Sequence, residues 1–346
     1  MIIDSTLLIF KMKYYILLLL VITNTFAQST KAINIQAEKQ YDLGNYKEAL
    51  DLYSKSIKID STDSKIYCNR AKTNYELKNF QQAQYDYEKA LKLSPKSAYV
   101  YSEMGFFHKL MNYPKNAIED CTNGLLYTDE NNNIKNVLLN TRADAYQALG
   151  AYSKAYDDYK TVLAQNPVES TEAICLVNIA KSLVKLDKNE EAIAYLEQCI
   201  SKHPNFIVAY NNLAFRLVEK GNYTKAIATN DKALEMIQQL KKDDKGLTEV
   251  SQKIKVANND LLIPMIHNNR GYAKYKLGKY DEALTDVNYS IQLYPDNSYA
   301  YRNRALIYIA QNKTSLACSD IQKAIDLNFE SSYGSEIITL KNQYCK

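Results

Sequence analysis

Two series of small side chains recur along the chain in a fixed phase. Alanine returns at the same interval in four of seven steps, as from Ala49 to Ala83, and the other steps equal this interval plus an insertion. A second small residue precedes each of these alanines at a constant distance, as Ala37 precedes Ala49. Because helices approach closely only where small side chains meet, each pair predicts two antiparallel helices in contact. The series are Ala49, Ala83, Ala117, Ala155, Ala192, Ala226, Ala283 and Ala317, preceded by Ala37, Ala71, Gly105, Ala143, Ala180, Ala214, Gly271 and Ala305.

The few glycines and prolines stand where such helical hairpins would turn and stop. The chain has 9 glycines and 6 prolines in 346 residues, which favours long helices over a many-stranded sandwich. Four glycines fall between paired helices, where a left-handed backbone suits glycine. Four prolines follow second helices and end them. These residues are Gly44, Gly150, Gly221 and Gly278, and Pro95, Pro167, Pro204 and Pro295.

With this period and these helix pairs, the chain resembles the tetratricopeptide repeat (TPR) family, whose unit is a helix–turn–helix of about 34 residues. The early tryptophan usual in that family is replaced by tyrosine or leucine. The resemblance implies an all-α, right-handed α-solenoid of about eight repeats. Their expected bounds are 30–63, 64–97, 98–131, 136–169, 173–206, 207–240, 264–297 and 298–331.

The regions outside these repeats suggest how the array is divided and closed. Residues 28–240 would hold six repeats and residues 264–331 two more, separated by a charged insertion at 241–263. We expect this insertion to act as a hinge or lateral bulge between lobes 30–240 and 264–346. Residues 332–346 predict a capping helix, with Ser335 as its N-cap and Ile337, Leu340 and Tyr344 on its apolar side. Such a cap covers the last repeat's inner face.

Residues 1–27 read as a signal peptide. Lys11 and Lys13 precede a short apolar run, Tyr14 to Ile22, and small residues at the end of the segment suit cleavage after Ala27. This run is too short to span a bilayer. An uncleaved anchor that also uses residues 7–10 is the alternative, and Met12 could be the true start. We therefore expect an exported protein, periplasmic, outer-membrane associated or secreted, that does not span a membrane after cleavage.

No pattern in the sequence indicates catalysis. The chain lacks a glycine-rich phosphate loop, HExxH and GxSxG. His108 and His267 are expected as packed or hydrogen-bonded core histidines, and carboxylate pairs such as Asp157 and Asp158 as solvated surface groups. The formal charge of +4 is too small for a nucleic-acid footprint. We expect no enzyme activity, cofactor, metal, nucleic acid or small-molecule substrate.

Six cysteines allow disulfide bonds in an exported protein. A bond between Cys318 and Cys345 would join the last repeat to the cap. Cys175 and Cys199 lie at the same end of the fifth hairpin and could also pair, or remain buried thiols. Cys68 and Cys121 are expected as thiols.

In the TPR family the first helices line a concave groove in which ligands lie. The helical register places a basic and aromatic set in the first half of this groove and an aromatic, aliphatic set in the second. These side chains could recognise a protein, or could pack between neighbouring helices. The candidates are Lys65, Lys72, Tyr75, Tyr99, Phe106, Lys109, Phe215, Tyr272, Tyr275, Tyr299 and Arg302.

An asparagine recurs at one equivalent site on five first helices. Aligned amides could grip an extended peptide backbone, since asparagine both donates and accepts hydrogen bonds. A common asparagine of such repeats is the alternative. The series is Asn69, Asn178, Asn212, Asn269 and Asn303. The motif around Asn69 also resembles the carboxylate-clamp repeats that hold acidic chaperone tails, but the cations of that clamp are missing at the matching sites, so we reject that subtype.

These features favour a non-catalytic scaffold that binds a peptide or protein subunit in the groove, within an envelope or secreted complex. The alternative is an assembly or chaperone-like factor for outer-membrane or secretion machinery, with transient binding. An enzyme would need a catalytic insertion, and 241–263 has no histidine, cysteine or glycine-rich turn.

Overall fold

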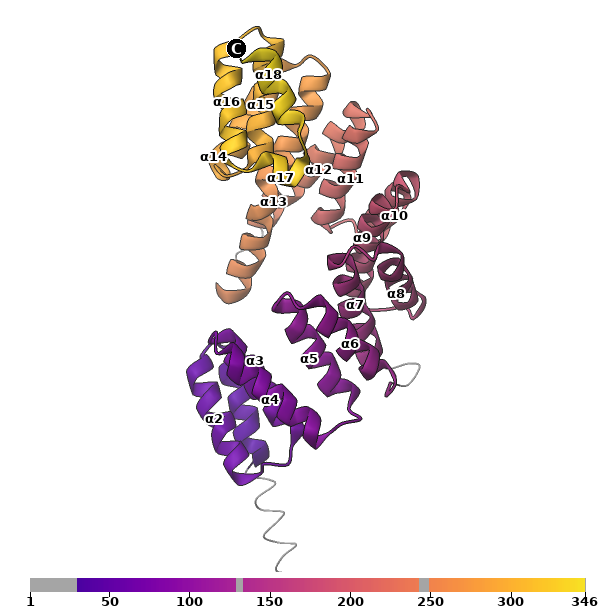
Figure 1. Ribbon diagram of the computed structural model, residues 1–346, viewed down its shortest axis with the longest axis vertical. Coiled ribbons are helices and arrows are strands. Elements are labelled where there is room, and N and C mark those ends of the chain that lie inside the picture. The colour runs from indigo at the N-terminus through magenta and orange to yellow at the C-terminus, as the bar shows by residue number, and fades with distance from the viewer. Residues whose placement is uncertain (1–29, 129–132, 243–248, 346) are drawn as a thin grey trace, which may run out of the picture. The chain divides into compact units, whose positions relative to one another are not determined.

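The computed structural model describes residues 30–128, 133–242 and 249–345, with side chains given for all of these except 241–261. The described residues form helices joined by short turns, without strands (Figure 1). The predicted all-α class is therefore confirmed. Residues 1–29, where the signal peptide was predicted, lie outside the described residues.

Each predicted repeat is a pair of helices. The first repeat comprises helical residues 30–42 and α2 (Tyr46–Ile59). The next three are α3 (Ser64–Glu76) with α4 (Phe80–Leu93), α5 (Ala98–Leu110) with α6 (Pro114–Leu125), and α7 (Asn133–Ala148) with α8 (Tyr152–Ala164). The last four are α9 (Glu169–Lys185) with α10 (Asn189–Lys202), α11 (Ile207–Glu219) with α12 (Tyr223–Lys242), α13 (Glu249–Lys276) with α14 (Tyr280–Leu293), and α15 (Ser298–Ala310) with α16 (Thr314–Asp326).

The small residues occupy the helix crossings, as predicted. All eight alanines of the second-helix series are completely buried. Two repeats use glycine on the first helix, where no space is left for a Cβ atom. A Cβ atom on Gly105 would lie 2.7 Å from the Cys121 sulfur, and one on Gly271 would lie 2.7 Å from Cγ2 of Val287. Glycine is therefore required at both positions, because a Cβ atom would clash with the side chain opposite.

We expect Gly271→Ala to destabilise the fold by about 1–3 kcal/mol through overpacking, which outweighs the gain of roughly 1 kcal/mol in helix propensity. Urea unfolding followed by circular dichroism measures this. In a Val287→Ala background the cost should shrink, because the atom that the new Cβ would meet is gone. An equal cost in both backgrounds would show that the helix spacing does not depend on this contact.

The inter-helix turns require positive φ whether or not glycine is present. Gly44, Gly150, Gly221 and Gly278 have φ between 74° and 78°, as predicted for a left-handed turn. In the other four repeats the same turn position is occupied by Lys78, Asn112, Asp187 and Asn312, with φ between 58° and 64°. The turn geometry is thus set by helix packing, and glycine only makes it easier to adopt.

An arginine and an aspartate link the two helices in four repeats. Each arginine donates from Nε to an aspartate oxygen at 2.7–2.9 Å and from Nη2 to the other oxygen. The pairs are Arg70–Asp86, Arg142–Asp158, Arg270–Asp286 and Arg304–Asp320. The prediction of a solvated surface group was therefore wrong for Asp158, which is buried. In the third repeat Met104 stands at the arginine position, and His108, four residues further along α5, contacts Asp120 at 2.6 Å instead.

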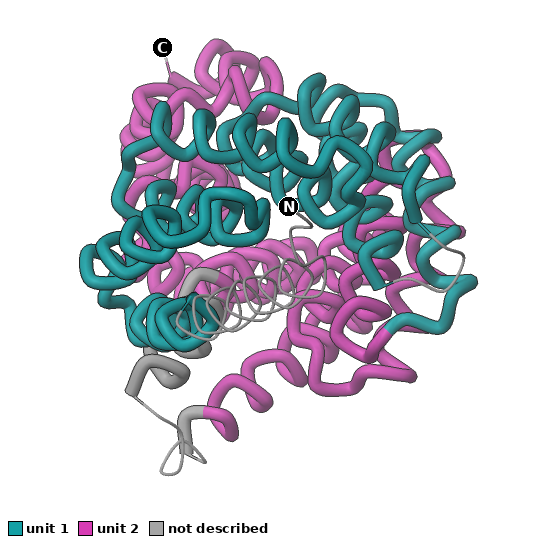
Figure 2. Tube along the Cα trace, turned by 90° about the horizontal axis from the view of Figure 1, so that it is seen from below, with its two compact units in different colours: residues 1–167 teal, residues 168–346 magenta. Residues whose placement is uncertain are grey.

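The chain divides into two compact units, residues 1–167 and 168–346 (Figure 2). The division lies between the fourth and fifth repeats, and not at 241–263 where a hinge between two lobes was expected. The reason is that α12 and α13 pack against each other. Ile237 of α12, Ile263 of α13 and Tyr210 of α11 belong to one apolar cluster. Helix α13 begins at Glu249, so much of the insertion extends the seventh repeat's first helix.

Two helices close the second unit. The predicted capping helix is α18 (Glu336–Tyr344), and a short helix that the sequence did not reveal, α17 (Phe329–Tyr333), precedes it. Ser335 stands at the N-cap position, but its side chain forms no capping hydrogen bond, so that expectation was wrong. Phe329 and Ile337 are fully buried in a cluster with Tyr301 and Ile321.

A disulfide joins Cys318 on α16 to Cys345 at the end of α18. It therefore connects the last repeat to the cap, at the pair considered from the sequence. The second pair considered, Cys175 with Cys199, is not joined. The Cys199 thiol instead faces the carbonyl oxygen of Ala173 at 3.7 Å. Cys68 and Cys121 are buried thiols whose pKa burial raises to about 12.

No helix in the described part of the chain is long and apolar enough to cross a membrane.

Candidate functional site

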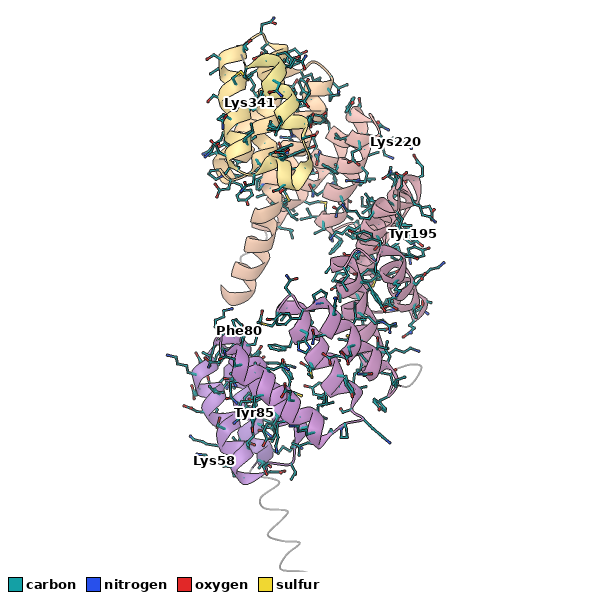
Figure 3. The ribbon with its side chains drawn as sticks, viewed as in Figure 1. Lys58, Phe80, Tyr85, Tyr195, Lys220 and Lys341 are labelled. Carbon is teal, nitrogen blue, oxygen red and sulfur yellow. A yellow bond between two sulfur atoms is a disulfide. The ribbon has the colours of Figure 1, made fainter. Side chains whose placement is uncertain are left out.

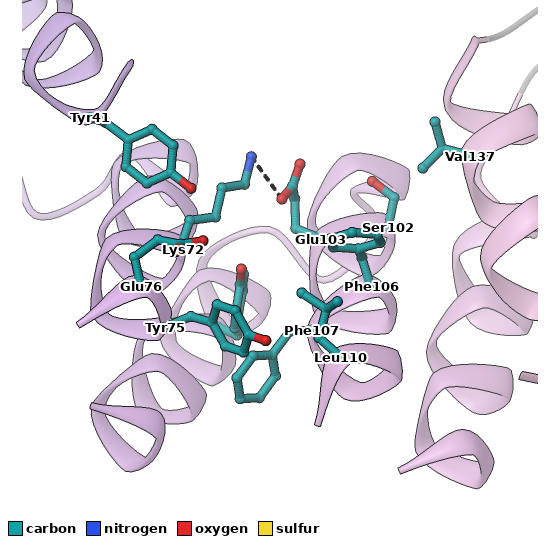
Figure 4. Close-up of a pocket in the computed structure, with 11 residues that line it drawn as sticks. Tyr41, Lys72, Tyr75, Glu76, Ser102, Glu103, Phe106, Phe107, Leu110 and Val137 are labelled. Carbon is teal, nitrogen blue, oxygen red and sulfur yellow. Dashed lines mark ion pairs between the residues drawn. The ribbon is translucent and has the colours of Figure 1, made fainter. Parts of the chain in front are cut away.

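The first unit has a pocket on the face formed by its first helices (Figure 4). Helix α3 contacts α5, and α5 contacts α7, so their side chains share one surface. The pocket has a volume of about 270 Å³. Three of the predicted groove residues, Lys72, Tyr75 and Phe106, line it. The others that line it are Tyr41, Glu76, Tyr87, Ser102, Glu103, Phe107, Leu110 and Val137.

Apolar and aromatic side chains form the floor and one rim of the pocket. The Tyr75 and Phe107 rings meet edge to face with centroids 6.2 Å apart, and Tyr87 lies beside Phe107 at 5.2 Å. The rim residues Phe106, Leu110 and Val137 remain 42%, 44% and 47% exposed. Large exposed apolar side chains around a concave site characterise a binding surface better than a packed core.

The charges at this pocket differ from the basic character predicted for the first half. Lys72 forms an ion pair with Glu103 at 2.8 Å, and Lys109 forms one with Asp144 at 2.9 Å (Figure 4 shows the first). Glu76 has no ion pair within the described ranges. The lining residues themselves therefore carry two carboxylates and one ammonium group, while the ammonium groups of Lys78 and Lys109 lie over the Tyr75 and Phe106 rings.

Burial and these carboxylates raise the pKa of tyrosines around the pocket. Burial, together with Glu76 and Glu103, raises the pKa of Tyr41 to about 12. Burial and then Glu103 also raise the pKa of Tyr99 well above its usual value. Both hydroxyls stay protonated at neutral pH and can donate hydrogen bonds to a ligand.

Eight of the eleven residues that line the pocket lie outside the positions predicted for the groove. Glu76 and Leu110 each lie five residues after the small residue of their first helix, whereas the three predicted residues that line the pocket lie one or four residues after it. The helical register is the signal that could have found Glu76 and Leu110, because each lies four residues after a predicted position, Lys72 or Phe106, and residues four apart are neighbours on one helix face. Lys65 and Tyr99, which were predicted, are not among the residues that line the pocket.

In the second unit, the predicted aromatic residues pack against their own neighbours. Tyr272 lies 5.8 Å from Tyr275, and the Arg302 guanidinium lies 5.1 Å from the Tyr272 ring. Phe215 lies under the guanidinium of Arg216 at 4.5 Å. A smaller pocket of about 170 Å³ between α9 and α11 includes Asn212 and Arg216. Tyr272 and Tyr275 therefore make the packing contacts that were considered as the alternative to ligand binding.

Two predicted groove residues of the last repeat are covered by the cap. Tyr299 stacks on Phe329 with centroids 6.0 Å apart and contacts Tyr333 at 4.9 Å, both on α17. Arg302 is buried and donates to the Glu336 carboxylate of α18 at 3.1 Å. Both were predicted to face a ligand. That prediction was wrong, because the C-terminal helices occupy this face.

The asparagines do not form a ladder of free amides. Asn303 is fully buried and donates to Asn268 at 2.9 Å, and Asn269 donates to Asn211 at 3.2 Å. Asn212 donates to the carbonyl oxygen of Val208 on its own helix at 3.0 Å. Asn69 donates to Glu38 at 3.3 Å. Most of these amides connect neighbouring first helices, and Asn178 lies half-buried on α9.

Comparisons with known proteins identify the repeats. Tetratricopeptide repeat profiles match residues 64–97, 264–297 and 175–205, and a further TPR repeat profile matches residues 38–78. The first two matches have the bounds predicted for repeats two and seven. The human mitochondrial import receptor subunit TOM34 is 33% identical over 239 residues, covering 67% of this chain and 68% of that protein. The chain belongs to the tetratricopeptide repeat family.

Other members and structures agree with this assignment. A TPR repeat-containing protein from Methanocaldococcus jannaschii is 23% identical over 56% of this chain, and the chain spans about a third of it (33%). The solved Cut9–Hcn1 assembly of the APC/C superposes over 87% of this TPR chain and 53% of the solved one, with TM-score 0.60 and 16% identity. A TPR protein from Cytophaga hutchinsonii gives TM-score 0.54 at 14% identity, covering 78% of this chain and 98% of that one. These structural likenesses show the fold.

The described residues contain no group of three or more histidine, cysteine or acidic side chains that could hold a metal ion. His108 and His267 are hydrogen-bonded to buried aspartates, in keeping with their predicted role in the core.

Proposed function

We propose that this TPR protein is a non-catalytic scaffold that binds a peptide or protein subunit on the first-helix face of its first unit. TPR proteins are in general protein-interaction scaffolds. The observation that supports the proposal here is the pocket around Phe106, where three large apolar side chains stay exposed beside charged groups. Interface anchors combine an apolar pocket with a polar rim in this way.

We expect the double variant Phe106→Ala/Leu110→Ala to lose its protein partner. Both side chains are more than two-fifths exposed, so the fold should persist while the apolar contact area disappears. Affinity capture from the source cell, followed by mass spectrometry, measures partner recovery, with at least a tenfold reduction expected.

The matched control is Tyr85→Ala. Tyr85 is an aromatic residue on α4 that is 58% exposed, more than Phe106, and α4 is a second helix that is not part of the first-helix face (Figure 3). Its removal should leave recovery unchanged. If the pocket variant recovers the same partners at the same level as the wild type, the pocket is not the binding site.

We also propose that the protein acts outside the cytoplasm, in an envelope or secreted complex. The apolar segment near the N-terminus and the cleavage pattern at Ala27 support export. The Cys318–Cys345 disulfide fits an oxidising compartment. Intact-mass measurement of the protein from fractionated cells tests this. An uncleaved mass confined to the cytosolic fraction would contradict export.

A further inference from the structure

We infer that the pocket of the first unit receives an arginine side chain that is flanked by an apolar or aromatic residue of the partner. The partner segment would thus be basic and apolar, and not acidic. This inference rests on the proposed function and adds the chemistry of the ligand.

The carboxylates of the pocket favour a cationic ligand. Glu76 enters it from α3 and Glu103 from α5, and Lys72 neutralises only one of them. Burial is the main reason that the pKa values of Tyr53 and Tyr99 are raised, and nearby carboxylates raise them further, Glu38 acting on both. A cation entering the pocket would find the Glu76 carboxylate, which has no ion pair among the described residues.

The aromatic rings of the pocket favour arginine over lysine as that cation. Phe106 and Tyr75 present ring faces beside the carboxylates, and protein cations already lie over both. Lys109 is 4.6 Å from the Phe106 centroid, and Lys78 is 5.5 Å from that of Tyr75. A guanidinium can stack on such rings while it binds a carboxylate through two N–H groups. Arginine therefore uses both features at once, which an ammonium group does less well.

The size of the pocket limits how much of the partner can enter it. Its volume of about 270 Å³ lies just below the range of about 300–1,000 Å³ for small-molecule sites, and the rim opens toward α7 at Val137. It suits one or two side chains of a longer segment. The apolar floor of Phe107 and Tyr87 would take the flanking residue, and the Glu76 and Glu103 side would take the guanidinium.

Replacing Lys72 should change the binding affinity in opposite directions for a basic and an acidic ligand. Lys72 is one-third exposed and already occupies Glu103, so an incoming arginine must compete with it. Removing the ammonium with Lys72→Met should strengthen binding of an arginine peptide roughly threefold to tenfold and weaken an acidic one. Glu76→Gln and Glu103→Gln should each weaken the arginine peptide about tenfold, in line with hydrogen bonds to charged groups.

The experiment selects short peptides from a random phage-displayed library on the purified chain and titrates the recovered peptides by calorimetry. The titrations use the wild type, Phe106→Ala/Leu110→Ala, Glu76→Gln, Glu103→Gln and Lys72→Met. The control is Glu88→Gln, which changes an exposed carboxylate on α4. Support consists of arginine beside an apolar residue in the selected peptides, the affinity changes given above, and no effect of Glu88→Gln.

The outcomes separate the two proposals. Peptides that require Phe106 and Leu110 but lack arginine, or that bind more weakly to Lys72→Met, overturn this inference and leave the pocket as a binding site. If no selected peptide depends on Phe106 and Leu110, the proposed function fails at this pocket, and the inference fails with it.

Discussion

Replacing Asp286 with alanine should cost about 3–5 kcal/mol of the free energy of unfolding, because Arg270 and Lys274, which are largely buried, would lose their buried counter-ion and keep only more exposed acidic partners on α12 and α14. Asp286 is only 2% exposed. It accepts from Arg270 Nε at 2.9 Å, and the His267 ring nitrogen and the Lys274 ammonium lie within 2.8 and 2.9 Å of its oxygens. The substitution removes the buried carboxylate of α14 that contacts all three groups, and leaves only Glu282, at 3.6 Å from Lys274, as an acidic contact from this helix.

Urea unfolding of the variant measures this cost, and Asp281→Ala on the same helix provides the control. Asp281 is exposed near the start of α14, so its loss should cost less than about 1 kcal/mol. A cost for Asp286→Ala no larger than that of the control would mean that the cluster contributes no net stability.

The same carboxylate predicts how stability changes in acid. Burial alone would raise its pKa, but hydrogen bonds from His267, Arg270 and Lys274 outweigh burial and hold the pKa well below the usual value. Its stabilising contribution is therefore present above the unfolded-state pKa of about 3.9 and is lost as the pH falls toward the folded-state value. Between pH 5 and pH 2, roughly, the wild type should lose more stability than Asp286→Ala. Parallel losses would contradict this.

Truncating Phe329 to alanine should destabilise the C-terminal end of the second unit by about 3–4 kcal/mol. The ring is fully buried and stacks between Tyr299 of α15 and Tyr333 of α17. Its removal leaves a cavity under the cap. Because each repeat of a solenoid contacts only its neighbours, the effect should concentrate in the last repeats.

Hydrogen exchange resolved by peptide measures where this loss falls. Amides of α15, α17 and α18 should exchange faster in Phe329→Ala, while those of the first unit stay protected. Tyr333→Ala is the control, because that ring is 55% exposed and should cost less than about 1 kcal/mol. Uniform acceleration along the chain would contradict a local role for Phe329.

The repeats could be predicted because their signal is local. The small residues, the turn glycines and the constant period each report a contact made within one hairpin or between adjacent ones. The burial of Asp158 is not a signal of this local kind. Its neighbour Asp157 has the same chemistry, and only the position of Arg142 on the paired helix decides that Asp158 is the buried one.

The site was less predictable because its character depends on pairing between repeats. Lys72 is basic in the sequence, yet Glu103, on another repeat, neutralises it. Tyr299 and Arg302 have the register of groove residues, yet α17 and α18 cover them. Short helices such as α17 have too few residues to show a periodic pattern, so what they cover could not be read from the register.

The arginine–aspartate link implies that the repeats do not all resist opening equally. It joins the two helices in repeats two, four, seven and eight, and a contact between His108 and Asp120 takes its place in repeat three. At the aspartate position, repeats one, five and six have Leu52, Tyr195 and Thr229. These hairpins lack the bidentate arginine–aspartate pair, although an ion pair between the half-exposed Lys202 and Glu172 joins the two helices of repeat five at 2.5 Å. Under mechanical load, the helices of these three repeats should therefore separate before those of the repeats that carry the pair.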